Sequence, residues 1–304
     1  FINFNKDLNL ILMNDIPLIL KILSSILFFF SGLLWKKILS GMANYVLIIY
    51  RTLFSIIFLL IFQILFFRSS EYFSFSSLFQ NGIREWFLSI LICFFSFFGL
   101  YFFTKAIQEG RFMMVLPLSS LTSVFAVISA FLFFNQKPSI IQLSALLIIL
   151  VSLGIHQFDK LRSFNIDKEI FFILLFAFFW GVSFTLYLIP INYFGPVNFS
   201  LILEFIVLIS AWFILVKSEK RILPSKINKR TLIFCVLIGI CVALGSLFSN
   251  IALSAVSVLT NVLTSLIFEA IVILIGLYHL GEKINYRDWL LIFGITLASI
   301  MIMI

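Results

Sequence analysis

Long apolar runs occupy almost the whole chain and constrain its fold more than any other sequence feature. Ten such runs lie between polar breaks, at about 16–35, 45–67, 86–104, 112–134, 139–156, 169–190, 198–216, 231–251, 256–279 and 285–304. A helix of about 20 apolar residues crosses a bilayer. The chain is 62% hydrophobic and 11% charged, far from the roughly 45–50% apolar and 25% charged residues of soluble domains. The sequence therefore predicts an all-α membrane protein with ten transmembrane helices.

The positive charge of the chain is concentrated in one segment. The net charge is +8, and residues 217–230, named here the basic stretch, hold six Lys or Arg residues and one Glu. In a membrane protein such a segment indicates a loop beside lipid headgroups, so we expect membrane lipids and not nucleic acid as partners. The three cysteines lie inside apolar runs and the two histidines are far apart. We therefore expect no metal site, and we predict no cofactor.

The two halves of the chain repeat each other at a constant offset of 146 residues. The identities at this offset are Gly99 and Gly245, Phe102 and Phe248, Ala106 and Ala252, Ser119 and Ser265, and Lys137 and Lys283. We therefore predict a five-helix repeat over 1–156, a linker loop over 157–168, and a second five-helix repeat over 169–304. Five crossings per repeat place the halves upside down relative to each other. Inverted repeats are typical of secondary transporters, whose binding site lies between the repeats.

Three motifs of the chain resemble those of the drug/metabolite transporter superfamily, in its ten-helix EamA-like form. The segment Trp180-Gly181-Val182-Ser183-Phe184 is similar to the W-G-x-x-F opening of that superfamily's halves, and Arg51 is similar to the arginine early in the second helix. The corner at residues 280–283 resembles the signature between the fourth and fifth helices of a repeat. The resemblance implies an exporter or exchanger of amino acids, other metabolites or drugs. It also implies a central cavity inside the first four helices of each half, with the fifth and tenth helices peripheral.

The chain also departs from the pattern of the superfamily. Ser31 stands where the first half should have its tryptophan, and Asn135-Gln136 replaces Gly-Glu at the corner. The proline of each fourth helix is missing near Ser123 and Glu269. These departures leave the substrate class open.

Three charged residues lie inside the predicted spans. Placing a charge there costs a few kcal/mol of free energy, so such a residue usually has a charged or polar partner or a functional role. They are Arg51, Glu204 and Glu269, and Glu204 stands where a repeat of the Arg51 position would fall. For Arg51 we weigh a solute-binding role against a side chain that reaches the headgroups or holds backbone carbonyls. Desolvation favours the neutral form of a buried carboxyl group. Glu269 and, second to it, Glu204 are therefore candidates for proton coupling, against a purely structural hydrogen-bonding role.

Polar and aromatic side chains within the second half complete the predicted solute pathway. They are Trp180, Tyr187, Asn250 and Asn261, and Asn261 lies eight residues before Glu269, on about the same helix face. We expect the second half to contribute most polar groups to the cavity, opposite an aromatic wall built from residues 28–30 of the first half. The alternative is that these side chains only form hydrogen bonds between helices.

The sequence favours a secondary transporter of a small organic solute by alternating access. It has no hydrolase, metalloprotease or phosphate-loop motif, so we expect no enzyme and no ATP-driven pump. The alternative is an interfacial enzyme that acts on a lipid-linked substrate. We expect a multi-pass protein of a cell membrane, the bacterial inner membrane, as a monomer or homodimer. The resemblance implies that both termini lie in the cytoplasm. That orientation places five Lys or Arg residues on the cytoplasmic side and fifteen on the opposite side, whereas the positive-inside rule favours the reverse.

Overall fold

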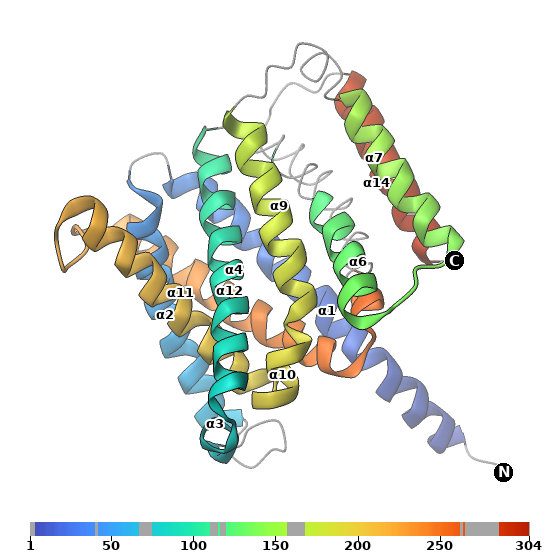
Figure 1. Cartoon of the computed structure of the whole chain (residues 1–304), viewed down its shortest axis with the longest axis horizontal. Helices are drawn as coiled ribbons and strands as arrows, with labels where there is room; N and C mark the ends of the chain where they lie inside the picture. The colour runs from blue at the N-terminus through green and yellow to red at the C-terminus, as the bar shows by residue number, and fades with distance from the viewer. Residues whose placement is uncertain are drawn as a thin grey trace.

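The structure, a computed structural model, describes residues 4–39, 42–66, 75–109, 115, 120–156, 168–261, 264 and 286–303. Regular structure within these residues is helical throughout (Figure 1). The helices are α1 (Phe4–Ile38), α2 (Asn44–Phe66), α3 (Phe75–Gln80), α4 (Ile83–Glu109), α6 (Leu121–Phe134), α7 (Ile140–His156), α9 (Lys168–Leu186), α10 (Leu188–Phe194), α11 (Pro196–Glu219), α12 (Lys229–Ala255) and α14 (Tyr286–Met303).

Six segments of the described chain are long and apolar enough to cross a bilayer. They are Ile16–Ile38, Asn44–Leu65, Ile83–Glu109, Ile170–Phe194, Pro196–Glu219 and Lys229–Ala255. Shorter apolar helices cover Leu121–Phe134, Ile140–His156 and Trp289–Ala298. Most of the predicted ninth span, at 256–279, lies outside the described residues, as does the first part of the fourth. The described residues therefore give a multi-pass helical membrane protein, and ten crossings stay a prediction.

Several predicted boundaries differ from the observed ones. The polar break between the predicted spans at 45–67 and 86–104 contains, in its described part, α3 and the start of α4. The predicted span at 169–190 is interrupted at Tyr187, between α9 and α10. Pro190 explains the interruption, because its nitrogen carries no hydrogen to donate to the carbonyl of Leu186, four residues earlier. Gly195, with φ of 77°, then separates α10 from Pro196 at the start of α11.

The helices of the two halves pack in matching pairs. α1 packs on α12 and α4 packs on α9, while α2 packs on α12 and α11 packs on α4. Suppose that the repeat relates α1 to α9, α2 to α11, α4 to α12 and α7 to α14. The contact of α1 with α12 then corresponds to that of α9 with α4, and the contact of α2 with α12 corresponds to that of α11 with α4. Two further large contacts, α2 with α11 and α7 with α14, then join equivalent helices to each other (Figure 1). α6 also packs on α9. A two-fold relation between the halves produces this pattern.

The direction of α2 relative to α11 follows from the polar contacts between them. Three polar contacts join the two helices: Tyr45 with Glu219, Arg51 with Glu204, and Gln63 with Asn198. Early residues of α2 meet late residues of α11, so the two helices run antiparallel. Antiparallel equivalent helices are the arrangement that an inverted repeat generates.

Two glycines allow neighbouring helices to approach closely. A Cβ atom on Gly181 of α9 would lie 2.5 Å from the backbone oxygen of Thr122 in the first turn of α6. A Cβ atom on Gly239 of α12 would lie 2.8 Å from the backbone oxygen of Arg51 in α2. Both distances are too short for a real side chain, so these two helix crossings depend on glycine.

Candidate functional site

A cavity of about 240 Å³ lies between α1, α2, α4, α6, α9, α11 and α12. Six of the residues predicted for the solute pathway line it: Arg51, Trp180, Tyr187, Glu204, Asn250 and Asn261. The seventh, Glu269, lies outside the described residues. Helices from both halves therefore bring these side chains to one chamber, although they are spread over 211 positions from Arg51 to Asn261.

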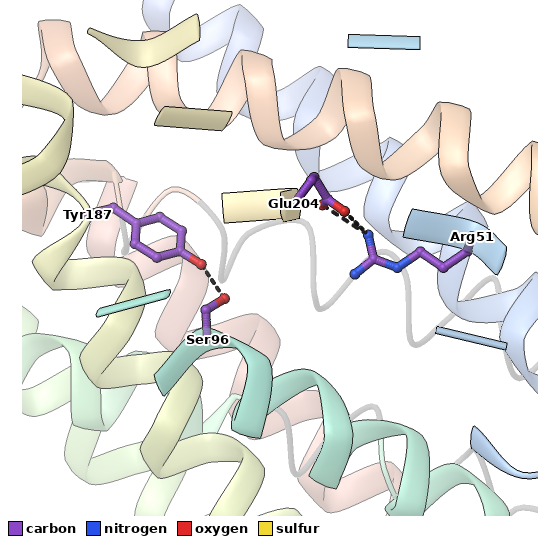
Figure 2. A network of polar contacts seen from close by, with 4 residues as sticks. All are labelled: Arg51, Ser96, Tyr187 and Glu204. Carbon is purple, nitrogen blue, oxygen red and sulfur yellow. Dashed lines mark hydrogen bonds and ion pairs between the residues drawn. The ribbon is translucent and has the colours of Figure 1, made fainter. Parts of the chain in front are cut away.

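The cavity contains a buried ion pair between the two halves. Nη1 of Arg51 donates to both carboxylate oxygens of Glu204, at 2.9 and 2.7 Å, and the two side chains are only 3% and 2% exposed. Figure 2 shows the guanidinium and the carboxylate pointing toward each other from α2 and α11. The alternatives for Arg51, a side chain reaching the headgroups or holding backbone carbonyls, are wrong, because its charge is met by Glu204.

This pair leaves hydrogen-bonding capacity unused. Nε of Arg51 is buried and has no hydrogen-bond partner. Burying two charges costs several kcal/mol each unless their attraction and further hydrogen bonds compensate. A polar solute entering the cavity would therefore meet a guanidinium that still has donors to offer.

A second polar contact in the cavity joins α4 to the break between α9 and α10. The hydroxyl groups of Ser96 and Tyr187 are hydrogen-bonded to each other, as Figure 2 shows. Tyr187 is 5% exposed and stands at the interruption caused by Pro190. The break thus places a buried phenol group at the cavity wall.

Two asparagines of the predicted pathway have different surroundings. Nδ2 of Asn250 donates to Oγ of Ser200 at 2.9 Å, which joins α12 to α11. Asn250 therefore forms an interhelical hydrogen bond and lines the cavity as well. Asn261 is 5% exposed, and its Oδ1 is buried without a hydrogen-bond partner. An unpaired buried acceptor costs about 1–3 kcal/mol, which a hydrogen-bond donor on a solute would recover.

Aromatic rings from α4 and α9 form one wall of the cavity. The ring of Trp180 lies 4.9 Å from that of Phe176, and 5.3 Å from those of Phe103 and Phe184. All four residues line the cavity. The expected first-half wall from residues 28–30 is only partly correct, because Phe28 and Phe29 line the cavity while Phe30 is 52% exposed. The larger aromatic surface comes from both halves together.

The expected asymmetry of the polar groups is wrong for the described residues. The first half lines the cavity with Lys21, Ser25, Ser31, Arg51, Ser96, Thr122 and Ser123. Lys21 donates from Nζ to Oγ of Ser249 at 3.3 Å, which joins α1 to α12. A signal for this wall is present in the sequence: Lys21, Ser25, Gly32 and Trp35 recur at spacings that place them on one face of a helix.

The described residues provide no metal site. No three His, Cys, Asp or Glu side chains among them come together in a way that would hold an ion. The chemistry that this part of the chain offers is recognition of a solute by charge, hydrogen bonds and aromatic surface.

Comparison with known proteins agrees with this geometry. The EamA-like transporter family model matches the chain twice, over residues 15–155 and 167–304. The chain therefore belongs to the EamA-like transporter family, within the drug/metabolite transporter superfamily. A search among curated protein sequences found no match. One solved crystal structure is similar with a TM-score of 0.67 at 13% identity, over 94% of this chain and 95% of that chain. That likeness supports the fold alone.

Proposed function

We propose that the protein is a secondary transporter, an exporter or exchanger, which moves a small organic solute across a cell membrane by alternating access. The halves 1–156 and 169–304, joined by 157–168, would form inverted five-helix repeats with ten crossings in total. The observation that carries the proposal is the buried Arg51–Glu204 pair, contributed by equivalent helices of the two halves to one cavity. The antiparallel contact between α2 and α11 and the family membership support it.

In this proposal the solute binds against Arg51, Glu204, Asn250 and Asn261, with Trp180 and Tyr187 on the facing wall. A cavity of about 240 Å³ is slightly smaller than the pockets of about 300–1,000 Å³ that hold drug-sized ligands. Of the proposed solutes, the volume therefore favours a small metabolite such as an amino acid over a larger drug-like solute. The other partners proposed are membrane lipids, and the protein would act as a monomer or homodimer in a bacterial inner membrane. No feature of the described residues favours the alternative of an interfacial lipid-modifying enzyme.

The test is solute flux into liposomes that contain only the purified protein. Stabilisation of the protein against heat by amino acids, nucleosides, amines and lipid precursors selects the solute for the assay. Glu204→Gln keeps the shape of the side chain but removes its charge. We expect it to weaken solute binding at least about tenfold, as loss of a hydrogen bond to a charged group does.

The matched control is Gln63→Leu, which removes a polar contact between the same two helices. Gln63 donates to Asn198 at 3.1 Å and does not line the cavity. We expect this variant to bind solute as the unmodified protein does. Liposomes without flux of any selected solute would contradict the proposed function. Equal loss of solute binding in Glu204→Gln and Gln63→Leu would show that the Arg51–Glu204 pair is not part of the solute site.

For proton coupling we propose Glu269, which lies outside the described residues, with Glu204 second. Glu269→Gln keeps the hydrogen-bonding shape and removes titration. We expect it to abolish accumulation of solute driven by a pH gradient and to leave exchange intact, as measured in the same liposomes. Accumulation with an unchanged pH dependence would contradict this role.

A further inference from the structure

We propose that the basic stretch, residues 217–230, is a binding site for the headgroups of anionic phospholipids. Its six cations are all exposed: Lys217, Lys220, Arg221, Lys226, Lys229 and Arg230. The expectation that the whole segment is a loop is wrong, because it contains the end of α11 and the start of α12. Lys217, Lys229 and Arg230 therefore lie on two helix ends, and the other three cations lie in the connection between them. An anionic membrane surface attracts each of the six.

The length of α11 places these cations at headgroup level. Its 24 residues extend about 36 Å, against a hydrocarbon thickness of about 30 Å. Lys220, with φ of 53°, ends the helix in a left-handed conformation. The chain therefore leaves α11 where the hydrocarbon region of a bilayer gives way to its headgroups.

The chain then folds back along α11 and presents an apolar surface beneath the cations. Nε1 of Trp212 donates to the backbone oxygen of Ile222 at 2.9 Å, and Trp212 lies seven residues, about 10 Å, before the end of α11. Phe213, Ile222 and Leu223 are 65%, 72% and 77% exposed. Tryptophan is enriched at membrane interfaces. Apolar side chains below a group of cations match the acyl chains and the phosphate of one lipid molecule.

Contacts with α2 fix the stretch and keep its single acid away from the cations. The hydroxyl of Tyr45 donates to Oε1 of Glu219 at 2.9 Å, and that of Tyr50 donates to the backbone oxygen of Ser225 at 3.2 Å. Within the described part of the chain, no acid forms an ion pair with a cation of the stretch. The site is thus held in place before a lipid binds, and no acid among the described residues neutralises its positive charge through an ion pair.

The experiment measures lipid binding by the full chain in detergent micelles. Brominated phosphatidylglycerol or brominated phosphatidylcholine is added, and quenching of Trp212 is obtained as the difference from Trp212→Phe. We expect phosphatidylglycerol to quench at a several-fold lower lipid fraction than phosphatidylcholine, and added salt to reduce the preference. The triple variant Lys217→Gln, Lys220→Asn, Arg221→Gln should lose most of this preference, so that the two lipids quench Trp212 at similar lipid fractions. Asparagine is chosen at 220 because it tolerates the left-handed conformation.

The matched control is Lys37→Gln, Arg84→Gln, Lys137→Gln, which removes the same charge from exposed positions elsewhere. It should keep the full preference for phosphatidylglycerol. Equal quenching by both lipids, or equal loss in the two triple variants, would overturn the proposal. Inorganic phosphate that displaces phosphatidylglycerol at low concentration would make this a site for soluble anions, which also overturns it. Binding is read without solute flux, so the result is independent of the proposed transport function.

Discussion

Replacing Glu204 by leucine should lower the free energy of unfolding by about 3–5 kcal/mol, because it leaves the guanidinium of Arg51 buried without a counter-charge. Arg51 is 3% exposed and Nη1 donates to both oxygens of Glu204. The unfolding temperature of purified protein in detergent measures the effect. The single change Arg51→Met should lower the free energy of unfolding by a similar amount, because it leaves the carboxylate of Glu204 buried without a counter-charge.

The double variant Arg51→Met, Glu204→Leu is the control for this prediction. It removes both charges together, and replacing a buried ion pair by apolar side chains is often neutral or stabilising. We therefore expect its unfolding temperature to return close to that of the unmodified protein. A double variant as unstable as either single one would show that the pair has no coupling energy.

Exchanging the two charges tests the relation between the halves. Arg51→Glu with Glu204→Arg keeps the pair but moves the cation from α2 to α11. If the two positions are equivalent across antiparallel helices, the exchanged pair should recover most of the stability that Glu204→Leu loses. If the exchanged pair recovers stability but not solute flux, solute recognition requires the guanidinium to be on α2.

The parts of the fold that could be predicted from sequence depend on local properties. Apolar length located the spans that became α1, α2, α4, α9, α11 and α12, because a lipid environment requires each helix to be apolar along its own length. Boundaries were less predictable. The interruption at Tyr187 depends on the missing hydrogen of Pro190, and α3 occupies a polar segment without a long apolar run.

The candidate site was predictable as a set of residues and not as a set of contacts. The charges of Arg51 and Glu204 stood out within apolar runs, and Glu204 was the candidate counterpart of Arg51 in the second half. Their pairing was missed because a linear sequence does not say which equivalent helices touch, and α2 and α11 do. The polar side of α1 at Lys21 and Ser25 was missed for another reason. Lys21, Ser25, Gly32 and Trp35 do share one helix face in the sequence. Polar residues are common near the start of a membrane span, however, so this spacing alone does not identify a cavity wall.

Gly181 sets the distance between α6 and α9. A Cβ atom on Gly181 would lie 2.5 Å from the backbone oxygen of Thr122 and 2.7 Å from Cβ of Phe125. Neither neighbour is the flexible end of a side chain, so Gly181→Ala requires the two helices to separate. We expect a loss of about 1–3 kcal/mol in the free energy of unfolding, as overpacking typically costs, and slower solute flux.

Gly154→Ala in α7 is the matched control, because a Cβ atom there has no neighbour within 4 Å. Alanine favours the helix over glycine by up to about 1 kcal/mol, so this variant should unfold at the same temperature as the unmodified protein or slightly higher. The same substitution thus has opposite effects at two helical glycines, and the difference isolates the helix contact from helix propensity. Equal unfolding temperatures for the two variants would mean that α6 and α9 do not approach through Gly181. Since Trp180, the residue before it, lines the cavity, loss of flux in Gly181→Ala alone would connect that helix contact to the solute site.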